Sequence, residues 1–204
     1  MDIDPGTIPH TERYKILIGA VIPRPIAWVS TISAGGQRNL APFSYFNAVS
    51  SDPMSLVFCP TRRGSQAAKK DTLSNIEATG EYVINIPTYG LRERMNLTGT
   101  DWGPDIDEFE AAGWTPAPSV VVRPPRVLES PISFECRGHQ IVVMGEGPGG
   151  GAAVIGTVVH LHLSDAVYQD GKIDHVALDA IGRIGGPLYC RVTDVFSLPR
   201  PPAP

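Results

Sequence analysis

The sequence predicts a mainly β protein, a barrel or a sandwich with only a few helices. Glycine and proline supply 21 and 20 of its 204 residues, a density that favours many short strands joined by turns. Seven segments are rich in β-branched and aromatic residues and have lengths typical of strands. A chain of this length buries one sizeable core and is most simply one domain, which we expect over residues 1–198.

The strand candidates follow one another along most of the chain. The first two are joined by Ala34-Gly35-Gly36-Gln37, a typical hairpin connection. The second contains Pro42, which has no amide donor and is therefore expected at a sheet edge or a bulge. The expected strands span residues 26–33, 40–49, 55–59, 82–86, 132–144, 153–164 and 188–193.

Helical signals are confined to short segments. The clearest helix covers 72–79, with Asp71 or Thr72 as its N-cap and Gly80 as the glycine that ends it. A second helix is expected over 91–97.

Two irregular stretches complete the chain. Residues 98–125 contain a short acidic helix candidate at 105–112, and we interpret the stretch as a surface excursion, a lid or a dimer arm. The last residues, 199–204, are rich in proline and are expected to form a disordered, extended tail.

The run MGEGPGGG, residues 144–151, fits the G-x-G-x-x-G spacing of a dinucleotide-binding loop. Such a loop requires a helix to begin at its last glycine. The following residues, 153–163, are rich in β-branched side chains and alternate like a strand, and Pro148 lies inside the loop. We therefore predict a β-hairpin connection here and no nucleotide site.

Bulk properties exclude several classes of protein. A net charge of −4 and a pI near 5.7 argue against a nucleic-acid-binding surface. The acidic start of the chain does not resemble a signal peptide, and no segment has the roughly 18 apolar residues of a membrane span. A cytoplasmic location without membrane or nucleic-acid partners is expected. Cys59, Cys136 and Cys190 lie far apart and are expected as reduced thiols.

Cations gather before the helix predicted at 72–79. A strand ends at Cys59, the loop after it carries Arg62 and Arg63, and Lys69 and Lys70 precede the helix. Free amides at a helix start and flanking cations are typical of a phosphate site. The alternative is a solvated basic surface.

The first predicted hairpin could border a flat ligand. Strand alternation puts Ser30 and Thr31 on opposite faces, and Pro42 leaves backbone groups free on the partner strand. Free backbone donors and acceptors beside an aromatic strand suit a planar heterocycle. The alternative is core packing of the aromatic residues, which are Trp28, Phe43, Tyr45 and Phe46.

Two further groups of residues were considered, one as a metal site and one as a catalytic triad. His160 and His162 share a strand face at a metal-ligand spacing, but no cysteine or carboxylate lies near them on that strand, so we expect no metal site. Ser44, His160 and Asp165 lack a nucleophile elbow, and no catalytic triad is expected.

Several motifs in order resemble the flavin reductase-like proteins with an FMN-binding split barrel. They are RPIAWVST (24–31), NLAPFSYFNAVSSDP (39–53), KDTLSNI (70–76), EYVINIP (81–87), PPRVLESPISFEC (124–136), IGTVVHLHLSD (155–165) and GRIGGPLYCRV (182–192). The resemblance covers nearly the whole chain. It implies a six-stranded Greek-key barrel with added helices, and a homodimer with FMN near the subunit interface.

The resemblance also implies site residues. With Arg62 added as a second cation, the implied cofactor-binding residues are Trp28, Ser30, Thr31, Asn39, Leu40, Ala41, Pro42, Phe43, Ser44, Arg62, Lys70, Asp71 and Thr72. Three further residues, His160, Arg183 and Tyr189, lie in motifs that resemble those closing the pocket.

The activity implied is an NAD(P)H-dependent flavin reductase in which the cofactor carries the chemistry and no side chain is catalytic. The alternatives are a flavoredoxin-like FMN electron carrier without its own turnover of NADH or NADPH, and a non-enzymatic flavin-binding protein. A monooxygenase is one conceivable electron acceptor. The chain departs from the Gly-Asp-His and Gly-Glu-Val motifs of many small reductases, with Gly138-His139-Gln140 and Gly156-Thr157-Val158 in their place.

Overall fold

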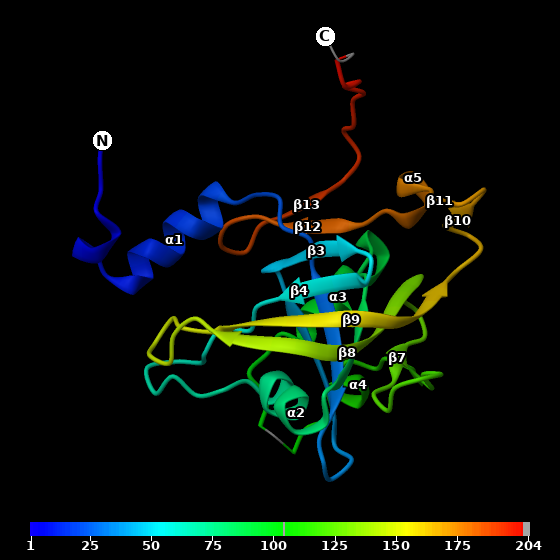
Figure 1. Cartoon of the computed structure of the whole chain (residues 1–204), viewed down its shortest axis with the longest axis horizontal. Helices are drawn as coiled ribbons and strands as arrows, with labels where there is room; N and C mark the ends of the chain where they lie inside the picture. Colours follow the sequence, from blue (N-terminus) through cyan, green and yellow to red (C-terminus); the bar gives the residue numbers. More distant parts are fainter. Residues whose placement is uncertain (104, 202–204) are drawn as a thin grey trace.

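A computed structural model describes residues 1–103 and 105–201, and its centre is one antiparallel sheet of seven strands (Figure 1). The strand order is β2-β1-β5-β8-β9-β4-β3. These strands are β1 (Ala27–Ile32), β2 (Arg38–Phe43), β3 (Phe46–Ser51), β4 (Met54–Phe58), β5 (Glu81–Asn85), β8 (Ile132–Val143) and β9 (Ala152–Leu163).

The sheet curls into a barrel. Its two end strands, β2 and β3, are consecutive in the chain and are separated only by Ser44 and Tyr45. The sheet edges therefore meet at this short link, where the Cys59 amide also donates to the Tyr45 carbonyl at 2.8 Å. β2 and β3 are not neighbours in the hydrogen-bonded strand order, so each remains an edge strand.

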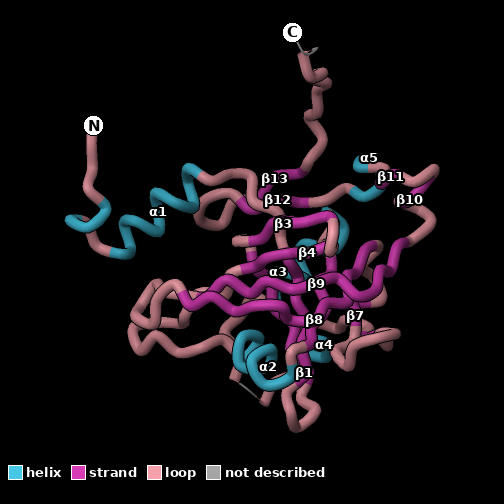
Figure 2. The backbone as a smooth tube through the Cα atoms, in the orientation of Figure 1, coloured by secondary structure: helices cyan, strands magenta, loops and turns pink. Residues whose placement is uncertain are grey.

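Short helices and small ladders surround the barrel. The helices are η1 (Pro5–Thr7), α1 (His10–Ala20), α2 (Asp71–Thr79), η2 (Tyr89–Leu91), α3 (Arg92–Leu97), α4 (Glu108–Ala111) and α5 (His175–Leu178). The small ladders pair β6 (Pro116–Ala117) with β7 (Arg126–Val127), β10 (Tyr168–Gln169) with β11 (Lys172–Ile173), and β12 (Ile181–Arg183) with β13 (Tyr189–Arg191). Figure 2 shows α2 against the barrel near β1, whereas α1 extends away from it.

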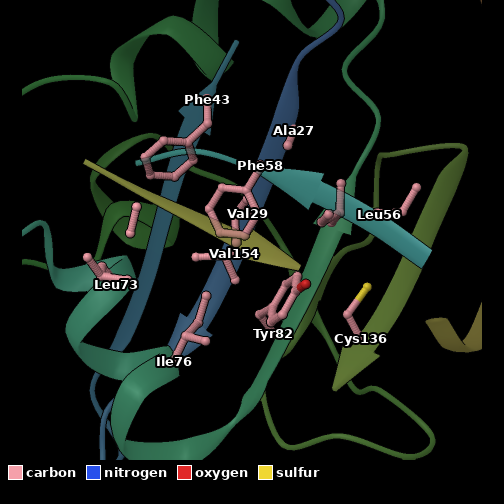
Figure 3. Packing of buried hydrophobic residues seen from close by; sticks show 12 residues of the cluster. Ala27, Val29, Phe43, Leu56, Phe58, Leu73, Ile76, Tyr82, Cys136 and Val154 are labelled. Atoms are coloured by element: carbon pink, nitrogen blue, oxygen red, sulfur yellow. The ribbon is translucent and has the colours of Figure 1, made fainter. Parts of the chain in front are cut away.

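The barrel interior is filled by aromatic and branched side chains (Figure 3). Phe58 lies between Phe43 and Tyr82, with ring centroids 5.2 and 5.5 Å away. Leu73 and Ile76 of α2 close one side of this core. Burial of such side chains contributes about 1.5–3 kcal/mol each, so α2 is held mainly by its apolar face.

The expected elements are found, with differences that have physical causes. The segment 40–49 is two strands and not one, because the chain crosses from one edge of the sheet to the other at Ser44 and Tyr45. The sheet therefore has seven strands where the resemblance implies six. Pro42 does lie on an edge strand, β2, as its missing amide predicted.

The helix at 71–79 ends at Gly80, whose φ of 70° is left-handed, as predicted. The predicted N-cap is wrong by one residue, since Lys70 occupies that position. The acidic helix is shorter than expected, and Asp107 caps it by accepting from the Phe109 amide at 2.9 Å. Helix α1 was not predicted.

The stretch 98–125 packs on the barrel by way of a second core. Phe109 and Trp114 meet Trp28 of β1, and the two tryptophan rings form an edge-to-face pair at 4.8 Å. The buried Glu108 accepts from the Leu40 amide at 3.0 Å. Through these contacts the described part of this stretch packs against β1 and β2.

At the C-terminus, residues 194–201 have no helix or strand, and residues 202–204 of the predicted tail lie outside the described part. No helix among the described residues is both long and apolar enough to cross a membrane.

Candidate functional site

The loop between β4 and α2 folds back on itself and brings Arg63 to the start of α2. We call residues 60–70 the basic loop. Arg63 and Ala68 exchange backbone hydrogen bonds of 2.8 and 3.1 Å across its turn. The Arg63 guanidinium lies 3.2 Å from the Asp71 carboxylate and 3.4 Å from that of Asp101. Among the described residues no side chain caps α2. The Leu73 amide donates to the Lys70 carbonyl at 3.0 Å, which leaves the amides of Asp71 and Thr72 open to an anion.

Lys70 is the cation without a partner at this site. Its side chain is half-buried and makes no ion pair or hydrogen bond with any described residue. Burial, together with the nearby Arg63, lowers the pKa of the Lys70 ammonium. Its Nζ lies 6.0 Å from the centre of the Phe43 ring. A half-buried cation left unpaired beside open helix amides is a feature that an anionic ligand would satisfy.

A cleft of about 400 Å³ is lined in part by Phe43, the residue whose ring lies 6.0 Å from the Lys70 Nζ. Five segments line it: α1, the residues just before β1, the end of β2, the end of α3 with the residues after it, and the β12–β13 hairpin. Pro42, Phe43 and Ser44 contribute from the end of β2, and Arg183 and Tyr189 from the hairpin. The size and the mixed lining suit part of a planar, polar heterocycle.

The lining of the cleft is held by hydrogen bonds. The Arg183 guanidinium donates to the Tyr189 hydroxyl and to the Gly186 carbonyl, and the Tyr189 hydroxyl in turn lies 3.0 Å from Asn96. The predicted residues Arg183 and Tyr189 thus meet Pro42, Phe43 and Ser44 in one cleft.

Sequence reasoning missed Arg24, which organises this cleft. Its buried guanidinium donates to the carbonyls of Ile18 and Val21, at the end of α1, and to that of Ile184 in the β12–β13 hairpin. It also lies 3.5 Å from the Ser44 hydroxyl. Arg24 stands at the start of the RPIAWVST motif, but nothing in the sequence says that it joins the end of α1 to the β12–β13 hairpin.

Arg63 was noted in the sequence only as part of the basic loop, yet it is the arginine beside Lys70. The predicted cation, Arg62, turns the other way: its guanidinium donates to the Ala67 carbonyl at 3.1 Å and lies 3.5 Å from Glu146. The side chains of Arg62 and Arg63 point in opposite directions, as successive side chains of a strand do, and the loop sequence does not reveal this.

Several predicted residues are buried behind the site. Trp28 donates to the Thr98 hydroxyl at 2.9 Å, Ser30 donates to the Pro125 carbonyl, and Leu40 is fully buried. The core-packing alternative therefore describes Trp28 and Phe43.

On the other face of β1, the Thr31 hydroxyl accepts from Asn75 at 3.0 Å, and Asn39 donates to the Thr72 hydroxyl at 2.9 Å. These two bonds tie α2 to β1 and β2. Ala41 is half-buried on β2.

His160 lies elsewhere, in a cluster with His162 and Glu135. One ligand atom of each residue lies within 4.8 Å of the others, a spacing compatible with a metal. The carboxylate comes from β8, the neighbouring strand, which the expectation about the histidines' own strand did not cover.

Four donors already occupy the carboxylate of Glu135. They are the Val120, Val121 and Val122 amides, at 2.6 to 3.0 Å, and His162 Nε2 at 2.6 Å. Burial alone would raise the pKa of this carboxyl, but these hydrogen bonds together lower it to about 2. Its lone pairs are used, so the cluster is explained as an anchor for residues 120–122.

Comparison with known proteins agrees with this geometry. The sequence model of the family described as "Flavin reductase like domain" matches residues 19–177. The chain belongs to the flavin reductase-like family.

Solved structures lead to the same family. Nitrilotriacetate monooxygenase component B of Bacillus cereus superposes with a TM-score of 0.92 at 32% identity, over 97% of this chain and 98% of that one. The 2-nitrobenzoate 2-nitroreductase of Pseudomonas fluorescens gives 0.85 at 32% identity, over 98% and 96% of the chains.

The fold itself is a split barrel. A protein of Shewanella frigidimarina, described as a flavin reductase with a split barrel domain, superposes with a TM-score of 0.82 at 24% identity, over 98% of this chain and all of that one. The predicted β-barrel class is confirmed, and the protein is a flavin-binding protein of the flavin reductase type.

Proposed function

We propose that this protein binds FMN and transfers hydride to it from NADH or NADPH. The observation that carries the proposal is the half-buried Lys70 beside the uncapped start of α2, which has no ion pair among the described residues and whose Nζ lies 6.0 Å from the ring of Phe43, a residue that lines the cleft. An FMN phosphate supplies the charge that this cation lacks.

One group of residues fits the phosphate of FMN, and another fits its flavin ring. The phosphate is held by Lys70, by the α2 amides of Asp71 and Thr72, and by Arg63. Arg62 stabilises the basic loop through its contacts with Ala67 and Glu146. The main chain of Ala41 to Ser44 borders the flavin ring. The buried Trp28, Ser30, Thr31, Asn39 and Leu40 support these strands from within.

When bound, FMN supplies the ring nitrogen that accepts hydride from a reduced nicotinamide. The chain's own residues bind and orient: Pro42 and Phe43 border the flavin, while Arg183 and Tyr189 close the opposite side of the cleft, where a nicotinamide would stack. No side chain is required as acid or base. His160, in the Glu135 cluster, is not brought to this cleft by any contact among the described residues.

We also propose a homodimer. No residue of α1 is buried, and five apolar side chains on or just after it remain 47% to 56% exposed: Tyr14, Ile16, Leu17, Val21 and Ile22. An exposed apolar patch of this kind marks an association surface. Because Tyr14 and Ile18 of α1 also line the cleft, a second copy seated on α1 would border the flavin site.

The test is a visible absorption spectrum of the purified protein with FMN, followed by NADH and NADPH oxidation in its presence. FMN binding with turnover of either dinucleotide supports the reductase. Binding without turnover would favour a flavoredoxin-like electron carrier, and a protein with no affinity for FMN would reject the proposal. A monooxygenase partner is proposed from the likeness to nitrilotriacetate monooxygenase component B, and copurification with such an enzyme tests it.

A further inference from the structure

The glycine-rich connection between β8 and β9 lies against the basic loop. We call residues 144–151 the glycine loop. Figure 2 shows the two loops on the same side of the molecule, beyond the ends of β8 and β9. The Arg62 amide donates to the Gly150 carbonyl at 2.8 Å, the Ala152 amide donates to the Pro60 carbonyl at 3.3 Å, and Thr61 pairs with Gly151 as an isolated β-bridge. The two loops thus share a short stretch of backbone ladder.

The close approach explains why glycine stands at 151. A Cβ on Gly151 would lie 2.7 Å from the Pro60 carbonyl oxygen and 3.2 Å from the Thr61 Cα. These are backbone atoms of the basic loop and cannot rotate away as a side chain could. A side chain at 151 therefore pushes the two loops apart.

Other contacts fix the glycine loop from its remaining sides. A Cβ on Gly150 would lie 2.4 Å from the Gly145 carbonyl oxygen, so the loop is closed tightly on itself. Gly149, with φ of 78°, packs against the His10 ring at the start of α1. Glu146 pairs with Arg62 at 3.5 Å. The glycine loop is therefore held by several contacts, and the first residues of the basic loop pack against it.

The contact continues to the anion site through two residues. Thr61 and Arg62 are held by the glycine loop, and the next residue, Arg63, closes the turn with Ala68 and reaches Asp71. Lys70 directly precedes Asp71 in the chain. We propose that the glycine loop is a positioning element for the phosphate of FMN: it holds the basic loop so that Arg63 and Lys70 face the start of α2. The inference rests on the phosphate site of the proposed function.

The experiment compares two alanine variants within the same loop. Gly151→Ala introduces the clash with Pro60 and Thr61. Gly147→Ala is the matched control, since no atom lies within 4 Å of its added Cβ and its φ is not in the left-handed region. Dissociation constants for FMN and for riboflavin, which lacks the phosphate, are measured for both variants and the parent protein by flavin fluorescence.

We expect Gly151→Ala to weaken FMN at least tenfold and riboflavin less than threefold, with Gly147→Ala within twofold of the parent for both. An unchanged FMN affinity in Gly151→Ala, or equal losses for both flavins, would overturn the inference. A parent protein that binds both flavins equally would instead reject the phosphate site, and with it the proposed function.

If Gly151→Ala does not fold, the affinities for FMN and riboflavin are measured for Gly150→Ala instead, because its clash lies inside the glycine loop. It should lower the preference for FMN over riboflavin in the same way. If circular dichroism shows both variants unfolded while Gly147→Ala folds, the glycine loop is a requirement of the barrel and the positioning role is rejected.

Discussion

His162 Nε2 donates to the Glu135 carboxylate at 2.6 Å, across two neighbouring strands of the barrel. The carboxylate is fully buried and also accepts from the amides of residues 120–122. One acidic side chain therefore joins β8, β9 and residues 120–122.

The first prediction is a loss of stability in acid. The pKa of Glu135 is about 2 in the folded protein against an ordinary value of 4.5. Its stabilising contribution is therefore present above about pH 4.5 and is lost as the pH falls toward 2. A shift of this size corresponds to about 3 kcal/mol. Urea unfolding at several pH values between 7 and 2 measures it.

Glu135→Gln should be less stable at neutral pH and should lose this part of the pH dependence. The matched control is Glu110→Gln, since Glu110 is largely exposed. A Glu135→Gln variant with the parent's pH profile would show that the amide contacts do not depend on the charge.

The second prediction concerns the dimer. Leu17→Glu places a charge among the exposed apolar residues of α1 and should shift the mass in light scattering from twice 21.9 kDa toward 21.9 kDa. Val176→Glu, on the exposed helix α5, serves as the control and should leave the mass unchanged. A parent protein of one subunit's mass with FMN bound would contradict the proposed homodimer.

The third prediction concerns the electron donor. Arg183→Gln removes a guanidinium that lines the cleft and holds Tyr189, so KM for the dinucleotide should rise about tenfold, or about 1.4 kcal/mol. FMN affinity should stay within about threefold, because Arg183 is not among the residues proposed to hold FMN. The exposed Arg123, which pairs with Glu81, provides the control variant Arg123→Gln. An unchanged KM would remove Arg183 from the donor site.

Local sequence signals were sufficient where a single element decides the structure. Gly80 ends α2 because only a left-handed residue suits that position, and β8 and β9 form a hairpin because β-branched residues follow the glycine loop. The cleft residues at 42–44 and at 183 and 189 were found through motifs rather than through spacing.

Tertiary contacts account for what the sequence did not reveal. Arg24 acts by joining two carbonyls at the end of α1 to the remote Ile184 carbonyl, and Glu135 reaches the histidines from another strand. Helix α1 has no buried face, so it lacks the apolar periodicity by which helices are recognised. Whether Arg62 or Arg63 faces Lys70 depends on the turn of a loop that the glycine loop holds.

The most direct test of the central claim is the affinity of Lys70→Ala for FMN and for riboflavin. A charge-assisted hydrogen bond contributes about 1.5–3 kcal/mol, so FMN should bind about 10- to 100-fold more weakly while riboflavin is little affected. Lys69→Ala is the control, because Lys69 pairs with Glu77 at 2.7 Å, and both flavins should bind it as they bind the parent. Equal losses for FMN and riboflavin in Lys70→Ala, or no loss for either, would contradict a phosphate site at the start of α2.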